Sequence, residues 1–146
     1  MIAQTIQLAL TPVFMLVAIG NILNLLSTRL ARIVDRARAL QEKHQTTTGP
    51  EHDVVVQEIR LVDRRIRLGT SAIRLLVISG VFVGATVVLL FLEETAQLSL
   101  QLAAAGTFTL ALGMLMTGLV LFLLETQISA AALRIPRDLL ELEREI

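Results

Sequence analysis

The sequence predicts an all-α integral membrane protein: three transmembrane helices, with a cytoplasmic antiparallel coiled-coil hairpin extending the first two. Apolar residues make up 54% of the 146-residue chain, more than the ~45–50% of an ordinary soluble domain. No charged side chain occurs in the stretches 2–28, 75–92 and 95–124. Between the first two of them a charged phrase occurs twice, as RIVDRARAL from Arg32 and as RLVDRRIRL from Arg60.

Each uncharged stretch is long enough to cross a bilayer, since about 20 helical residues span a hydrocarbon core of ~30 Å. We place the spans at about residues 8–28, 75–92 and 98–124 of a single membrane domain, 1–146. The first lacks the basic segment and cleavage site of a signal peptide, so we expect it to be retained. Thr11-Pro12 is either a kink in this helix or a cap with proline at the first helical position, which would leave 2–10 at the interface.

Basic residues indicate the orientation of the chain in the membrane. They gather in segment 29–74, whereas the link between the second and third spans carries only Glu93 and Glu94. The basic segment is therefore expected in the cytoplasm, which puts the N-terminus outside and the C-terminus inside. Residues 135–146 predict a C-terminal amphipathic helix.

A heptad seam runs out of the first span and returns into the second. Its members on the first arm are Pro12, Leu16, Ile19, Leu23, Leu26, Leu30, Ile33, Ala37, Leu40 and His44. On the second arm they are His52, Val55, Ile59, Val62, Ile66, Gly69, Ile73, Leu76, Gly80, Val83, Val87 and Leu90. Two seams of this length predict the antiparallel coiled coil, and Gly49-Pro50 between them ends one helix and starts the next.

Charge selects the register of this hairpin. One register places Lys43 opposite Glu51 and Arg36 opposite Glu58, whereas a slip by one heptad puts Arg36 opposite Arg65. We expect the first, although each exposed pair contributes only ~0.2–1 kcal/mol.

The favoured register leaves Arg29 facing Arg65 beside the membrane, where anionic lipid headgroups are the nearest expected anions. Asp35 and Asp63 have two readings. In the first, each aspartate pairs with arginines of its own helix: Asp35 with Arg32 and Arg38, and Asp63 with Arg60 and Arg67. In the second, each contacts a neighbouring subunit or a protein partner. The candidate contacts with anionic lipid or a partner are Arg29, Arg32, Asp35, Asp63, Arg65 and Arg74.

The stretch TPVFMLVAIG followed by TRLARIVDRARAL resembles the bacterial membrane proteins grouped as domain-of-unknown-function family 2721. The resemblance covers about residues 5–130 and includes a second basic helix and two further spans. It implies a small bacterial inner-membrane protein and assigns no catalytic residue. Thr28 stands where the family pattern often has Asn.

Polar residues of the first span lie mostly opposite the seam: Gln7, Thr11, Asn21, Asn24 and Thr28. Such a face is unfavourable against lipid, so we expect protein or water to cover it. Hydrogen bonds between helices of a homo-oligomer and a polar path through an oligomer both satisfy this requirement. Gly80 and Gly84, in GVFVG, are candidates for close helix packing.

The sequence predicts no catalytic, cofactor or metal site. There is no Cys, and the two histidines near the hairpin tip, His44 and His52, do not make a closed zinc site. Glu125, at the inner end of the third span, is expected to be exposed. The zero net charge gives no argument for nucleic acid.

We therefore expect a non-enzymatic homo-oligomeric scaffold or regulatory protein in the lipid bilayer. The alternative is an oligomeric channel or transporter-like pore lined by the polar face of the first span.

Overall fold

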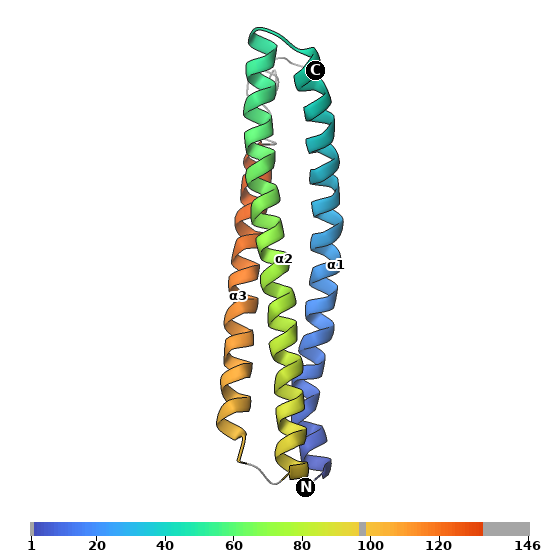
Figure 1. Cartoon of the computed structure of the whole chain (residues 1–146), viewed down its shortest axis with the longest axis vertical. Helices are drawn as coiled ribbons and strands as arrows, with labels where there is room; N and C mark the ends of the chain where they lie inside the picture. Colours follow the sequence, from blue (N-terminus) through green and yellow to red (C-terminus); the bar gives the residue numbers. More distant parts are fainter. Residues whose placement is uncertain (1, 97–98, 133–146) are drawn as a thin grey trace, which may run out of the picture.

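The computed structural model describes residues 2–96 and 99–132, which form three long helices (Figure 1). They are α1 (Ile2–Thr46), α2 (Pro50–Ala96) and α3 (Gln101–Ala132). All three are long and apolar enough to cross a membrane, which confirms the prediction of an all-helical fold with three candidate spans. The predicted helix 135–146 lies outside the described residues.

α1 is one continuous helix that contains Pro12. Of the two readings of Thr11-Pro12, the structure therefore has a proline within a helix. α1 ends at a tight turn in which the Thr47 amide donates to the Lys43 carbonyl at 3.1 Å. Gly49 follows with φ of 70°, a conformation that glycine adopts without steric cost. Pro50 then opens α2, where a missing N–H costs nothing.

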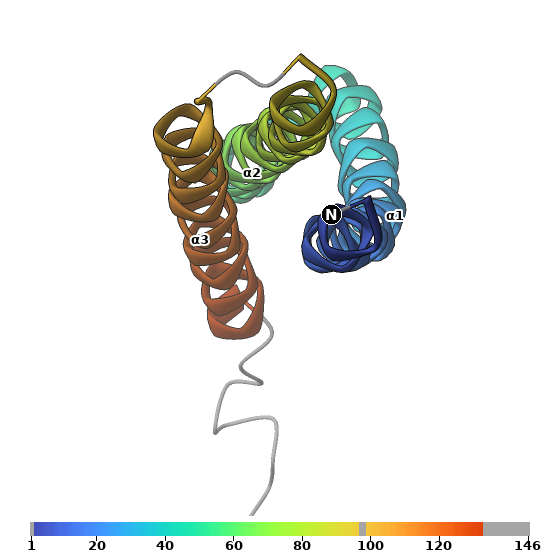
Figure 2. The same ribbon diagram turned by 90° about the horizontal axis from the view of Figure 1, so that it is seen from below.

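α2 lies between α1 and α3, as the view along the bundle shows (Figure 2). Every residue of the predicted α1–α2 seam is at least partly buried except His44. The two predicted ion pairs of the hairpin are also present. Arg36 Nε lies 2.9 Å from Glu58 Oε1, and Lys43 Nζ lies 3.2 Å from Glu51 Oε1. These contacts confirm the register chosen by charge.

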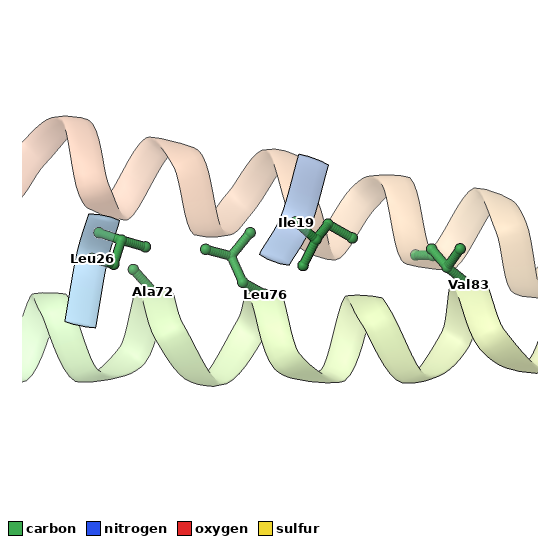
Figure 3. Close-up of a cluster of buried hydrophobic side chains, with 6 residues drawn as sticks. Ile19, Leu26, Ala72, Leu76 and Val83 are labelled. Atoms are coloured by element: carbon green, nitrogen blue, oxygen red, sulfur yellow. The ribbon is translucent and has the colours of Figure 1, made fainter. Parts of the chain in front are cut away.

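Two apolar clusters hold the helices together. The one nearer the hairpin tip joins α1 and α2 through Ile33, Leu40, Val55 and Val62. The other lies in the uncharged half of the bundle and contains Ile19, Leu26, Ala72, Leu76, Val83 and Ala111 (Figure 3). This second cluster draws on all three helices, because α2 presents one face to α1 and another to α3.

A second seam joins α2 to α3 and consists of residues at seven-residue intervals, which are small except for an arginine and a glutamate at one end. On α3 its members are Ala104, Ala111, Gly118 and Glu125, and on α2 they are Arg65, Ala72, Ser79 and Thr86. Ser79 Oγ donates to the Ala111 carbonyl at 2.8 Å. The Thr86 and Thr107 hydroxyls lie 2.9 Å apart. Small side chains allow two helices to approach closely without relying on a hydrophobic driving force, which is weak between lipid-embedded helices.

Candidate functional site: a buried carboxylate between two arginines

The α2–α3 seam ends in a charged group, the Glu125 carboxylate, whose side chain is only 3% exposed. Its Oε1 accepts hydrogen bonds from Arg65 Nε at 3.0 Å and from Ser129 Oγ at 2.8 Å. Its Oε2 accepts one from Arg29 Nη2 at 3.1 Å. A single carboxylate thus links all three helices.

Helix periodicity explains how these groups meet. Glu125 continues the row of Ala111 and Gly118 on α3, and Arg65 continues the facing row of Ala72 on α2. Arg29 comes from α1, directly before the seam residue Leu30.

The guanidinium carbon of Arg29 also lies 5.1 Å from the centre of the Phe122 ring, one turn before Glu125 on α3. This geometry is that of a cation–π contact. Phe122 therefore holds Arg29 over α3 independently of the ion pair.

The expectation that Glu125 is exposed is wrong. A carboxylate can be buried only when hydrogen-bond donors and opposite charges replace its water, and the two arginines with Ser129 supply both.

The prediction that Arg29 and Arg65 face each other agrees with the structure, but the anion between them comes from the chain itself. Their side chains remain 34% and 22% exposed. Two guanidinium groups around one carboxylate leave one positive charge in excess, so the site can still contact an outside anion such as a phosphate.

The other predicted contact residues lie on the surface of the hairpin. Asp35 Oδ1 lies 3.8 Å from Arg38 Nη1, and Asp63 Oδ2 lies 2.7 Å from Arg67 Nη2. Both aspartates thus have a partner on their own helix, which supports the local reading. Arg32 and Arg74 are exposed and do not join the Glu125 cluster. Contact of these side chains with lipid or a partner stays a prediction.

The polar face of α1 is uncovered. Gln7, Thr11, Asn21, Asn24 and Thr28 are all exposed. The Thr28 hydroxyl donates to the Asn24 carbonyl of its own helix at 3.0 Å. Within the described residues, the Asn21 and Asn24 side-chain amides have no hydrogen-bond partner.

The two glycines proposed for packing differ in their surroundings. A Cβ at Gly80 would lie 3.9 Å from side-chain atoms of Leu16 and Ile19, so Gly80 faces α1. A Cβ at Gly84 would meet nothing within 4 Å. At the hairpin tip, the His44 and His52 rings lie 4.4 Å apart. The described part of the chain contains no group of three or more metal-ligating side chains.

The sequence analysis missed Glu125, Phe122 and Ser79 as contributors to the fold and the site. A signal was present in the sequence, namely the seven-residue spacing of Ala111, Gly118 and Glu125. It escapes a search for apolar periodicity because Ala111 and Gly118 differ from their neighbours in size rather than in polarity, and Glu125 is charged.

Comparison with known proteins agrees with the resemblance seen in the sequence. The model of one protein family, described as a protein of unknown function (DUF2721), matches residues 9–135. The comparison with curated proteins found no match, and the comparison with solved structures found none either.

Proposed function

Because the chain belongs to the DUF2721 family, whose function is unknown, we propose from its own geometry that it is a non-enzymatic, homo-oligomeric scaffold or regulatory protein of the bacterial inner membrane. The observation that carries the proposal is the uncovered polar face of α1. Asn21 and Asn24 are exposed within a stretch of the helix that has no charged residue and belongs to a candidate span.

A second copy of the chain is the simplest cover for this face. The α1 seam is already occupied by α2, and α3 packs on the other side of α2 and touches α1 only sparsely. An amide left in hydrocarbon without a partner is costly, whereas hydrogen bonds between membrane helices contribute ~0.6–2 kcal/mol each. Self-contact of this kind usually closes into a symmetric oligomer.

The hairpin of residues 29–74 is the surface that we propose binds lipid headgroups or a protein partner. We place it in the cytoplasm as a coiled coil, since it holds most of the basic residues of the chain. The Glu125 cluster fixes the base of this hairpin to α3. The partly exposed guanidinium groups of Arg29 and Arg65 are then available to the phosphates of anionic lipids, and the surface beyond them to a protein partner.

The alternative function is an oligomeric channel or transporter-like pore lined by the polar face of α1. The exposure of Gln7, Thr11, Asn21, Asn24 and Thr28 favours it. The charge pattern does not favour a pore, because the Glu125 carboxylate binds Arg29 and Arg65 of the same chain and does not lie on the polar face of α1. A conducting path usually carries a charged ring.

The test is to replace Asn21 and Asn24 together by Leu and to measure the mass of the particle by light scattering, in mild detergents and in nanodiscs. We expect smaller species than for the wild type. The matched control is Thr109→Leu with Thr117→Leu on α3, because these exposed hydroxyls donate to carbonyls of their own helix at 2.8 Å and need no partner.

Single-channel recording of the same proteins separates the two functions. An oligomer that survives the asparagine substitutions while a wild-type conductance disappears indicates the pore, since water leaves an apolar constriction. A wild-type protein that is monomeric in several detergents and in nanodiscs contradicts both proposals.

A further inference from the structure

A cavity of about 570 Å³ lies between the three helices at the end of the bundle opposite the hairpin tip. α1 contributes Leu8 and Pro12 to its wall, α2 contributes Leu90, and α3 contributes Ala105 and Phe108. All of these residues belong to candidate membrane spans. In Figure 1 this is the lower end, where α1 begins, α2 ends and α3 begins.

The cavity is an open groove and not a closed chamber. α1 and α3 both pack on α2 but touch each other only sparsely, and the view along the bundle shows them on either side of it (Figure 2). Leu8 lines the cavity and is nevertheless 58% exposed, and Ala105 is exposed as well. Because these helices belong to candidate spans, the groove opens towards the acyl chains of a bilayer.

The wall of the groove changes from polar to apolar along its length. Glu93, Glu94 and Gln101 line it where α2 ends and α3 begins. Thr86 and Phe108 lie about two helical turns further into the bundle, a distance of ~10 Å along the helix axes. A lipid shows the same change from headgroup to hydrocarbon over a comparable distance.

The deeper part of the groove suits hydrocarbon better than water. An ordered water needs roughly two to four polar partners. The buried Thr86 hydroxyl is already engaged, since it donates to the Phe82 carbonyl at 2.9 Å and lies 2.9 Å from the Thr107 hydroxyl. Leu8, Leu90 and the other apolar side chains that surround it offer no polar atom.

We propose that this groove binds one acyl chain of a phospholipid, with its methylene groups between Leu8, Leu90 and Phe108 and its headgroup at the level of Gln101. The volume falls within the ~300–1,000 Å³ of pockets that hold small molecules. A helix of a second copy is too wide, because a cylinder of ~10 Å diameter fills ~790 Å³ over a depth of ~10 Å. Without an occupant, the side chains of the wall would lose their dispersion contacts on one side.

The test uses the absence of Trp and Tyr from the chain, which makes one introduced tryptophan the source of the fluorescence. Phe108→Trp places the indole in the groove, whereas Leu110→Trp places it at a position of the same helix that is 46% exposed and does not line the groove. Each protein is reconstituted in nanodiscs of phosphatidylcholine with brominated acyl chains, which quench tryptophan on contact. It is then transferred to dodecyl maltoside and washed.

We expect quenching to persist after washing in the Phe108→Trp protein and to be lost in the Leu110→Trp protein, because detergent replaces lipid that the groove does not hold. Adding Ala105→Phe to Phe108→Trp is expected to abolish the retained quenching, since the new ring fills the groove from an exposed position. Ala103→Phe is the matched control, because Ala103 is exposed on the same helix and does not line the groove.

A phosphorus assay on washed protein without an introduced tryptophan gives a second measurement. We expect one phospholipid per chain in the wild type and in Ala103→Phe, and none in Ala105→Phe. Circular dichroism checks that each variant remains helical.

Loss of quenching from both tryptophan proteins on washing, retained quenching in the Ala105→Phe protein, or no phosphorus in the washed wild type would each overturn the proposal. A Phe108→Trp protein that is not quenched even in the nanodiscs would show that protein, such as a second copy, covers the groove. A brominated fatty acid in unbrominated nanodiscs provides the remaining comparison, and stronger retained quenching by it would contradict the assignment to a phospholipid. Loss of oligomerisation in the asparagine variants leaves these results unaffected, because the groove lies within one chain.

Discussion

Replacing Glu125 by Gln removes the negative charge between Arg29 and Arg65 while preserving the size of the side chain. The wild-type carboxylate accepts three hydrogen bonds, from Arg29, Arg65 and Ser129. In the variant the amide nitrogen is itself a donor, so at least one guanidinium group loses its acceptor. The two arginines then face each other without an anion.

The expected loss of stability follows from the burial of the Glu125 carboxylate. Removing one partner of a buried ion pair costs ~3–5 kcal/mol. Arg29 and Arg65 are 34% and 22% exposed, so water recovers part of that loss. We expect Glu125→Gln to lower the free energy of unfolding by about 2–4 kcal/mol, which shifts the unfolding equilibrium by about thirtyfold to several hundredfold.

The assay uses an introduced thiol, because the chain has no Cys, Trp or Tyr. Val83→Cys places a sulfhydryl at a position that is 0% exposed between the helices. The fraction of thiol that becomes reactive along a titration with sodium dodecyl sulfate reports unfolding. Arg38→Gln is the reference, since its pair with Asp35 spans 3.8 Å between side chains that are 75% and 74% exposed. It is expected to change stability by less than ~0.5 kcal/mol.

The double variant Arg65→Gln, Glu125→Gln separates the ion pair from general damage. Its loss is expected to be smaller than the sum of the two single losses, because the second substitution removes a charge that the first left unpaired. Additive losses, or a Glu125→Gln protein as stable as the Arg38→Gln reference, would refute the reasoning.

Two further predictions concern packing and topology. A Cβ at Gly118 would lie 3.2 Å from Leu76 Cγ and 3.4 Å from the Ala72 carbonyl oxygen, so Gly118→Ala is expected to lose ~1–3 kcal/mol in the same thiol assay. At Gly113 a Cβ meets nothing within 4 Å. Gly113→Ala is therefore expected to leave the free energy of unfolding unchanged or to raise it by up to ~1 kcal/mol. Equal losses of stability at Gly113 and Gly118 would contradict the close packing of the α2–α3 seam. Reporter fusions after Gly49 are expected to report cytoplasm and those after Ser99 the outside, since most basic residues lie in segment 29–74, which comprises the C-terminal part of α1 and the N-terminal half of α2; the reverse pattern would contradict the proposed orientation.

The α1–α2 hairpin could be predicted closely because half of it carries charges. Beyond residue 28 the arms alternate apolar seam residues with polar ones, so periodicity reveals the buried face. The choice between Glu58 and Arg65 as the partner of Arg36 then settled the register, and the structure has the pair with Glu58.

The candidate site depended on a contact that apolar periodicity does not reveal. Arg29 and Arg65 could be placed opposite each other from the hairpin register alone. Their anion could not be identified, because Glu125 lies 60 residues from Arg65 and 96 from Arg29 along the chain. Nothing in the hairpin pattern specifies which face α3 turns towards it.

The sequence by itself determined the three candidate spans, the seam between α1 and α2 and the register of the hairpin, because these depend on hydrophobicity and charge along neighbouring segments. Only the tertiary structure decided how α3 packs, and with it the burial of Glu125. Apolar residues are spread around α3 instead of lying on one face, as is expected of a helix that packs between lipid and other membrane helices. Its orientation is decided by the small residues Ala104, Ala111 and Gly118, whose close fit against α2 places Glu125 between the two arginines.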